Sequence, residues 1–248
     1  MGEDKNLGDL IKSFEQERPR VPPTAPAWDL DKVLLYLRSG VFEPLSDKDL
    51  HTITKKTLFL VSLATAKRVS ELQALSNIVS KKGHDLFLSY TKSFIPKTAS
   101  DSNLLPRSFR LKSLREFAPG FEEEALLCPV RALSIYMKRV KGFLPRGSSL
   151  FVAPKAPSRP ISKNSISFFL RKVIIEAQAA RNNDPIGIRA HSVRGIATST
   201  AYAHNYSVAR ILEAATWKSA SIFSSCYFRD LEYSLDDLKS LGPFVSAD

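Results

Sequence analysis

The sequence predicts a mainly α-helical α+β fold with one small antiparallel β-sheet near the middle of the chain. Helices are favoured by the apolar run 58–63 and by residues 166–177, where apolar side chains recur at helical spacing. Apolar residues alternate with others over residues 84–90, which is typical of a strand. With 44% hydrophobic residues and only 10 glycines in 248 positions, the chain has the composition of a folded globular protein.

The chain is expected to open with an arm, residues 1–27, which is charged at its start and proline-rich over residues 18–26. One compact domain is expected over residues 28–233. Residues 234–248 are expected to form a C-terminal helical tail, with an amphipathic segment at 234–241, that could pack on a neighbouring copy or on its own domain.

In the first half of the domain, Ser46 and Asp49 are expected to form a capping box ahead of a long helix through Leu63. A break near Thr65 and Ala66 should precede a short helix over residues 68–75.

The sheet is expected to contain a strand at residues 84–90 and a returning strand at 108–111. The proline- and serine-rich segment 93–106 should join them as a hairpin or long turn. A further short strand is expected at residues 150–153.

The second half is expected to be helical. Pro129 suits the first turn of a helix, and Ser162 should cap the helix that carries the apolar face 166–177. Further helices are expected over residues 192–203, 207–215 and from Ser219 to about Phe228.

The charge balance predicts a polyanionic partner. The 36 Lys and Arg residues exceed the 25 Asp and Glu residues, which gives a formal charge of +11 and a pI near 9.7. The phosphate backbone of nucleic acid is the commonest polyanion, although a merely soluble basic protein would have the same balance.

Other classes are disfavoured. Cys128 and Cys226 cannot make a disulfide framework, and no Cys-x-x-Cys pair indicates zinc. The longest apolar stretch, residues 57–66, is too short for a bilayer, and the acidic-polar N-terminus does not look like a signal peptide. A soluble, intracellular protein is therefore expected.

A set of scattered side chains could cleave a phosphodiester without a metal. Such a site needs fixed cations for the nonbridging oxygens, a proton for the leaving oxygen and a nucleophile that can lose its proton. The arginine fork matches two phosphate oxygens, and a tyrosine can form a covalent phosphotyrosine. The candidates are Arg68, His191, Arg194, Trp217 and Tyr227.

Each candidate also has an ordinary structural explanation. Arg68 could extend from a helix end into solvent, and Glu71 could either orient Arg68 or be a surface partner. Trp217 and Tyr227 could be core aromatic residues. Taken together, the residues favour a site because their order and spacing are close to those of a known enzyme family that they resemble.

These segments resemble the tyrosine recombinase (phage integrase) superfamily over roughly residues 28–233. Residues 65–72, Thr-Ala-Lys-Arg-Val-Ser-Glu-Leu, resemble the box with the family's first arginine, and residues 191–194 resemble its His-x-x-Arg box. Trp217 falls where most members have histidine and a minority have tryptophan, and Tyr227 falls on the nucleophile.

Longer segments resemble the recombinases of DIRS- and Ngaro-type retrotransposons. The chain departs from the superfamily at Ala66, where glycine is usual, and at Gly195, where histidine is frequent. The interval from Trp217 to Tyr227 is also slightly long. The resembling segments are residues 64–69, 127–133, 189–195 and 214–217.

The resemblance implies the tyrosine recombinase catalytic-domain fold and an enzyme that cleaves and rejoins DNA through a 3′-phosphotyrosine, without metal, ATP or any other cofactor. It implies that Arg68 and Arg194 clamp the phosphate, that Trp217 donates a further hydrogen bond and that His191 helps Tyr227 to lose its proton. The family's hairpin lysine acts as general acid. Lys92 and Lys97 both lie in the hairpin, and Lys97 fits the resemblance better.

The implied partners are double-stranded DNA and further copies of the chain, as a dimer or tetramer on DNA, with no membrane. A mobile-element recombinase acting in the nucleus is the leading expectation. The alternatives are a domesticated nuclear protein that binds DNA or chromatin without cutting it, and a type IB topoisomerase. The vertebrate lamina-associated polypeptide, alpha isoform, resembles such a domesticated protein.

Overall fold

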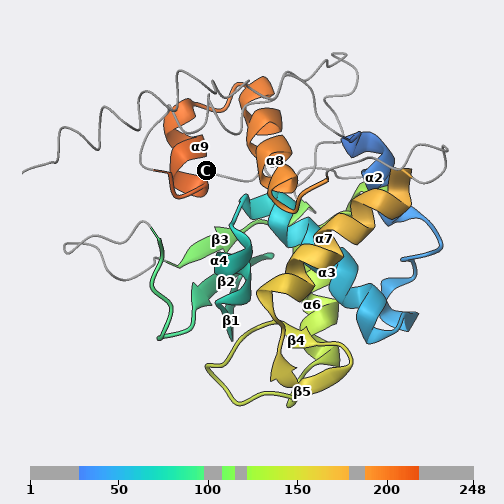
Figure 1. The fold of residues 1–248 in the computed structure, drawn as a ribbon, viewed down its shortest axis with the longest axis vertical. Coiled ribbons are helices and arrows are strands. Elements are labelled where there is room, and N and C mark those ends of the chain that lie inside the picture. The colour runs from blue at the N-terminus through green and yellow to red at the C-terminus, as the bar shows by residue number, and fades with distance from the viewer. Residues whose placement is uncertain (1–27, 98–107, 115–121, 179–187, 218–248) are drawn as a thin grey trace, which may run out of the picture.

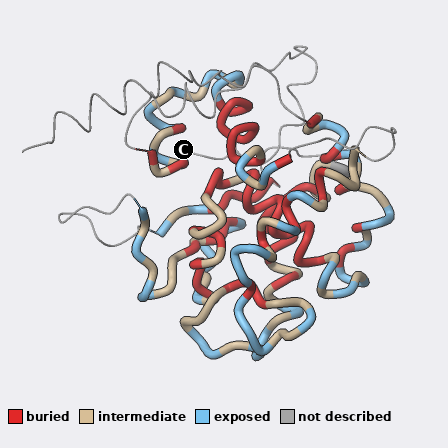
Figure 2. The backbone as a smooth tube through the Cα atoms, viewed as in Figure 1, coloured by how far each residue is buried: buried red, intermediate tan, exposed pale blue. Residues whose placement is uncertain are grey.

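The fold is organised around α3 (Leu50–Thr65), a helix that is buried along almost its whole length. Three other helices, α6 (Pro129–Arg139), α7 (Lys163–Gln178) and α8 (His191–Ala203), pack against it. Figure 1 shows α7 crossing α3, and Figure 2 shows that buried residues concentrate on α3 and along α8. The computed structural model describes residues 28–97, 108–114, 122–178 and 188–217.

The predicted α+β class with a dominant helical part is confirmed. None of the helices in the described part of the chain is long and apolar enough to cross a lipid bilayer. The expected arm 1–27, the expected helix 219–228 and the expected tail 234–248 lie outside the described residues. The remaining described helices are α2 (Leu30–Arg38), the 3-10 helix η1 (Leu45–Asp47), α4 (Val69–Gln73), α5 (Glu122–Ala125) and α9 (Val208–Ala214).

Local polar residues set the starts of several helices. The predicted capping box of Ser46 and Asp49 is wrong, because Ser46 belongs to η1 and Asp49 is itself the N-cap of α3, accepting a 2.7 Å hydrogen bond from the Thr52 N–H. The hydroxyl of Ser162 accepts from the Ser165 N–H at 3.0 Å, as expected for a cap of α7. Ser207 caps α9 in the same way.

The predicted break after the long helix is confirmed at Ala66, which has a left-handed backbone with φ 48°. Glycine is the usual residue in this conformation because it has no Cβ to clash. The chain then turns and begins α4 directly after Arg68. The expected helix 68–75 is too long, since Leu75 already belongs to a strand.

The main sheet has the order β1 (Leu75–Lys82), β2 (Asp85–Tyr90) and β3 (Phe109–Leu111), with both pairs antiparallel. Strand β1 was not predicted because it is an edge strand whose second half is largely exposed and polar, so its sequence shows no apolar alternation. Gly83, with φ 61°, makes the tight turn between β1 and β2.

A second, two-stranded sheet pairs β4 (Val152–Ala153) with β5 (Ala156–Pro160). The strand predicted at 150–153 is thus shorter than expected. Strand β5 escaped prediction because it contains Pro157 and Pro160, which a sheet tolerates at an edge where no partner needs the missing N–H.

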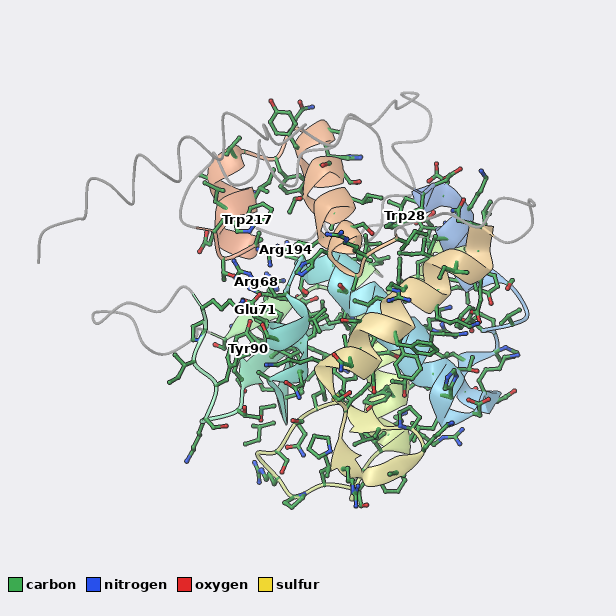
Figure 3. All side chains as sticks on the ribbon, in the orientation of Figure 1. Trp28, Arg68, Glu71, Tyr90, Arg194 and Trp217 are labelled. Atoms are coloured by element: carbon green, nitrogen blue, oxygen red, sulfur yellow. The ribbon has the colours of Figure 1, made fainter. Side chains whose placement is uncertain are left out.

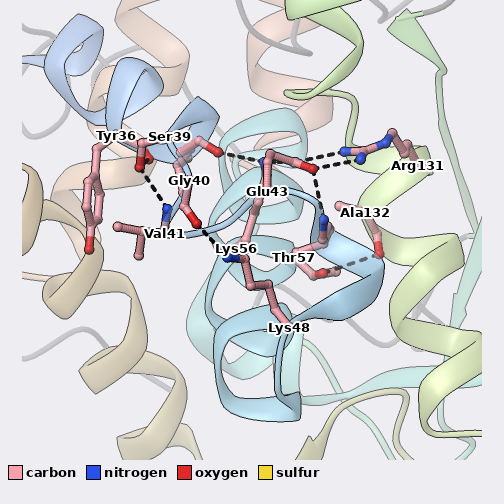
Figure 4. Close-up of polar contacts among 12 residues, drawn as sticks. Tyr36, Ser39, Gly40, Val41, Glu43, Lys48, Lys56, Thr57, Arg131 and Ala132 are labelled. Carbon is pink, nitrogen blue, oxygen red and sulfur yellow. Dashed lines mark hydrogen bonds and ion pairs between the residues drawn. The ribbon is translucent and has the colours of Figure 1, made fainter.

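A buried ionic network fastens α3 to its surroundings (Figure 4). The ammonium group of Lys56, on α3, donates to the Leu37 carbonyl at 2.6 Å and to Glu43 at 2.5 Å. Arg131, on α6, makes a two-pronged contact with the same carboxylate at 2.9 and 2.8 Å. The carboxylate of Glu43 therefore joins the segment after α2 to both α3 and α6.

The helices α8 and α9 stand at one end of α3 (Figure 1). The indole N–H of Trp28, a buried residue, donates to the hydroxyl of Ser192 at 2.8 Å and so ties the beginning of the described chain to the first turn of α8. Helix α8 in turn packs on α3 and α9. This arrangement brings the beginning of α8 next to the turn between α3 and α4.

Candidate active site

The carboxylate of Glu71 lies at the centre of the candidate site and is buried. Its Oε2 accepts a 2.7 Å hydrogen bond from the Arg68 backbone N–H, and it lies 3.7 Å from Arg68 Nη1 and 3.5 Å from Arg194 Nη1. Its Oε1 accepts from the Thr216 hydroxyl at 2.8 Å. A buried carboxylate is tolerated only when it is paired and hydrogen-bonded, and Glu71 satisfies both conditions with partners from three parts of the chain.

Figure 3 shows Glu71, Arg68, Arg194 and Trp217 following one another between α4 and α9. Arg68 is the more accessible arginine, with 19% of its side chain exposed against 2% for Arg194. The two guanidinium groups therefore converge on one carboxylate, Arg194 from the interior and Arg68 from the side nearer to solvent. The sequence alternative in which Arg68 only extends from a helix end is wrong.

The end of α9 is closed by a Schellman motif. The Thr216 N–H donates to the Glu213 carbonyl at 3.0 Å, and the Trp217 N–H donates to the Leu212 carbonyl at 2.9 Å. Thr216 takes the left-handed position of this motif, with φ 52°. Because a β-branched residue is strained in that conformation, contacts from the rest of the protein must hold it there.

Two cations complete the capping of α9. The last carbonyls of a helix have no partner within it and carry partial negative charge. The Ala214 carbonyl accepts from Lys67 Nζ at 3.0 Å, and the Ala215 carbonyl accepts from Arg194 Nη2. The carbonyls at the end of α9 are thus satisfied by the Schellman motif, by Lys67 from the turn between α3 and α4, and by Arg194 from α8.

Trp217, which is buried, lies directly against Arg194. The guanidinium carbon of Arg194 is 4.5 Å from the centroid of the indole ring, which is a cation–π contact. The sequence allowed Trp217 to be a core residue or a member of the site. The structure shows a buried indole ring that packs on one of the candidate arginines.

His191 is the first residue of α8 and is exposed. Partial burial and the positive charges of Arg194, Arg68, Lys97 and Arg189, in that order, lower the pKa of His191. The imidazole is therefore held in its neutral form near pH 7, which is the form that can accept a proton. This places His191 in the same electrostatic neighbourhood as both arginines.

Lys92 and Lys97 are both exposed in the segment that follows β2. The charge of Lys97 is one of the smaller contributions that lower the pKa of His191. The hairpin predicted over residues 93–106 is described only as far as Lys97. Tyr227 lies outside the described residues.

Tyr90 lies at the end of β2, and its label in Figure 3 follows that of Glu71. Its ring stacks on Phe94 at 5.1 Å and contacts Phe109 at 5.9 Å between centroids. Burial, followed by the negative charge of Glu71, raises the pKa of Tyr90. Tyr90 therefore loses its proton less readily than a free tyrosine and supports the hairpin by packing.

Sequence reasoning missed two residues of the cluster, Lys67 and Thr216. Lys67 lies in segment 64–69 directly before Arg68, and Thr216 lies in segment 214–217 directly before Trp217. The only signal for Lys67 was a lysine in an otherwise apolar run before Arg68. Thr216 carried no signal beyond its place before Trp217.

Comparison with solved structures bears on the fold of the chain. The chain is similar to the crystal structure of XerA recombinase, with a TM-score of 0.50 and 17% identity over 88% of this chain and 69% of that one. A lambda integrase tetramer bound to a Holliday junction gives a TM-score of 0.48 and 15% identity over 93% and 59% of the two chains. A lambda integrase dimer bound to a COC′ core site gives 0.47 and 10% over 88% and 53%.

No protein-family model matches the sequence, and no curated protein sequence is close enough to match. The likeness thus lies in the three-dimensional arrangement, in which helices packed on α3 carry a small antiparallel sheet on one side. On this evidence the chain has the α+β fold of the tyrosine recombinase catalytic domain.

Proposed function

We propose that this protein is a tyrosine recombinase that cleaves and rejoins DNA strands through a 3′-phosphotyrosine. The observation that carries the proposal is the convergence of Arg68 and Arg194 on Glu71. The charges of the same two arginines contribute to the lowered pKa of His191. The fold shared with XerA recombinase gives independent support.

The charges of the cluster suit a phosphodiester. Three cations, Lys67, Arg68 and Arg194, lie around the buried carboxylate of Glu71. The cations still outnumber the carboxylates when the exposed Glu213 is counted as well, so the cluster keeps a net positive charge. Fixed cations that need no rearrangement stabilise the charge that develops on the nonbridging oxygens in the transition state. Arg68 would contact the phosphate from the accessible side, and Arg194 with Trp217 would support it from the interior.

The chemistry would proceed in two reversible steps. His191 would accept the proton of the Tyr227 phenol, whose oxygen attacks phosphorus. The bond from phosphorus to the 5′ oxygen breaks, and Lys97 would give that oxygen a proton. In the second step a 5′ hydroxyl would give its proton to Lys97 and attack phosphorus. The bond to the tyrosine oxygen breaks, His191 would return the proton to the phenol, and the DNA bond is restored. The bond energy is kept in the covalent intermediate, so no ATP is consumed.

Within this class, a mobile-element origin related to the DIRS and Ngaro elements is supported by the segments around Arg68, Arg194 and Trp217. We further propose the nucleus as its location and a dimer or tetramer on double-stranded DNA as its working form. Sedimentation with and without a DNA duplex, and with residues 234–248 removed, would test the role of the tail in self-association.

A trapped covalent adduct tests the proposed reaction. A DNA duplex with a nick close to the cleavage position releases a short fragment, so rejoining fails and the protein stays attached. The wild-type protein and Tyr90→Phe should both form the adduct, because Tyr90 serves only in packing, whereas Tyr227→Phe should not form it. An adduct that persists in Tyr227→Phe, or none with the wild type on any duplex from the element termini, contradicts the assignment.

One observation favours the alternative of a domesticated DNA-binding protein. Arg194 is buried, and its Nη1 and Nη2 already contact Glu71 and the Ala215 carbonyl. In that alternative the cluster stabilises the fold and binds DNA only through its exposed cations. Salt-dependent DNA binding without any adduct would identify this second function.

A further inference from the structure

Lys67 is a buried lysine that adds its charge to the cluster but has no contact with DNA in the proposed reaction. It lies between the end of α3 and the beginning of α4 and is 7% exposed. Its ammonium group donates to the Ala214 carbonyl of α9 at 3.0 Å and lies 4.9 Å from the ring centroid of Phe109 in β3. One side chain thus contacts the last turn of α9 and a strand of the main sheet.

The position is unfavourable for a positive charge. Burial lowers the pKa of Lys67 to about 8, and the charges of Arg194 and Arg68 act in the same direction. Glu71, from α4, and Glu213, from α9, oppose this effect. An apolar side chain of similar volume would fill the space without the cost of desolvating a cation, so packing alone does not explain a lysine here.

What the ammonium group adds is a directed bond to a helix end. A cation is favourable at the C-terminal end of a helix, where carbonyl groups lack partners. The hydrogen bond from Lys67 holds the Ala214 carbonyl. Two and three residues further on, Thr216 and Trp217 complete the Schellman motif. The indole of Trp217 then lies on the guanidinium group of Arg194.

We infer that Lys67 is a positioning residue, which holds the end of α9 through the Ala214 carbonyl and thereby sets Trp217 against Arg194. The effect on Trp217 stands on the geometry alone. The effect on DNA cleavage rests on the proposed function. Lys67 itself acts through Ala214 and touches neither Trp217 nor, in this proposal, the DNA.

The fluorescence of Trp217 reports the position of its ring directly. The chain has only two tryptophans, so Trp28→Phe leaves Trp217 as the single emitter. In that background Lys67→Met removes the donor but keeps an unbranched stem, and Lys67→Arg restores both donor and charge. Lys56→Met is the matched control, because Lys56 is also a buried lysine that donates to a backbone carbonyl, that of Leu37.

Lys67→Met should shift the Trp217 emission to the red and open the ring to acrylamide quenching. Lys67→Arg should reverse at least part of both changes, and Lys56→Met should cause neither, although it also destabilises the fold. In single-turnover cleavage Lys67→Met should be slower by on the order of 10- to 100-fold with little change in DNA affinity, as for a displaced catalytic group.

Unchanged Trp217 emission in Lys67→Met, or an equal shift in Lys56→Met, overturns the inference. The outcome is separable from that of the proposed function. If the emission responds as expected but the wild type never cleaves DNA, the positioning role stands and the recombinase assignment fails. If the wild type cleaves and Lys67→Met matches it in rate and emission, the assignment stands and the positioning role fails.

Discussion

The hydroxyl of Thr216 donates a 2.8 Å hydrogen bond to the carboxylate of Glu71, from a position 145 residues further along the chain. The same hydroxyl accepts from Arg68 Nη1 at 3.4 Å, so it bridges the carboxylate and the more accessible arginine. Thr216 has a left-handed backbone, which is strained for a β-branched residue. The side-chain contacts with Glu71 and Arg68 add to the backbone hydrogen bonds of the Schellman motif in holding this conformation.

The effect of replacing Thr216 on stability should therefore depend on whether the new side chain keeps the hydroxyl. Thr216→Val keeps the shape and the backbone strain but leaves a buried carboxylate oxygen without its donor, which should lower the free energy of unfolding by about 1–3 kcal/mol. Thr216→Ser keeps the donor and should remain near the wild type. Urea unfolding measures both. Equal stability of the Val and Ser variants would show that the hydrogen bond contributes nothing.

Removing the charge of Glu71 should disturb the site more than removing any one of the cations around it. Glu71→Gln keeps the size of the side chain but leaves Arg194 buried without a counter-charge, a change that typically costs about 3–5 kcal/mol. Thermal unfolding should show a large decrease in stability, and adduct formation should fall because Arg68 loses its orientation. If Glu71→Gln unfolds at the wild-type temperature, the carboxylate is not the centre of the cluster.

Much of the fold could be predicted because local signals agree with the tertiary structure. Helix α7 shows apolar periodicity and a serine cap, and the end of α3 coincides with a predicted break. Strands β1 and β5 could not be predicted, since their pairing with β2 and β4 overrides polar and proline-rich sequences. Asp49 rather than Ser46 caps α3, because Ser46 belongs to the 3-10 helix that precedes it.

The site was only partly predictable for a similar reason. Arg68, Glu71, His191, Arg194 and Trp217 lie in short segments that resemble a known pattern. Contacts in the structure join four of them, Arg68, Glu71, Arg194 and Trp217. Lys67 could not be found in this way, because its partner is a backbone carbonyl 147 residues away. Any residue can offer a carbonyl, so the sequence around Ala214 carries no mark of the contact.

The titration of His191 should reflect its cationic neighbours. Its lowered pKa means that the neutral imidazole, the form able to accept a proton, persists to more acidic pH than in a free histidine, whose pKa is about 6.5. Arg189→Gln removes one of these cations and should move the midpoint upward. Proton NMR measures it, with His191→Asn identifying the resonance. A midpoint above that of free histidine, or one that does not move in Arg189→Gln, contradicts the electrostatic picture.

The ionic network of Glu43 makes a separate prediction about acid stability (Figure 4). Burial alone would raise the pKa of Glu43, but hydrogen bonds from Arg131 and Lys56 outweigh it and lower the pKa to about 2. At Lys56 the balance is opposite, because burial outweighs the attraction of Glu43 and lowers its pKa to about 8. The network therefore stabilises the charged form of Glu43, whose carboxylate contacts two cations, and not the charged form of Lys56.

A depressed carboxylate pKa contributes stability that is complete above the unfolded-state pKa of about 4.5 and is lost as the pH falls toward 2. Glu43→Gln should therefore lower the free energy of unfolding by on the order of 3 kcal/mol at pH 7 and flatten its decline between pH 5 and 3. Urea unfolding at several pH values measures both effects. Asp47→Asn is the control, because Asp47 is an acidic residue of η1 outside this network. It should keep the wild-type dependence of the free energy of unfolding on pH. The same pH dependence in the wild type and both variants would exclude Glu43 as its source.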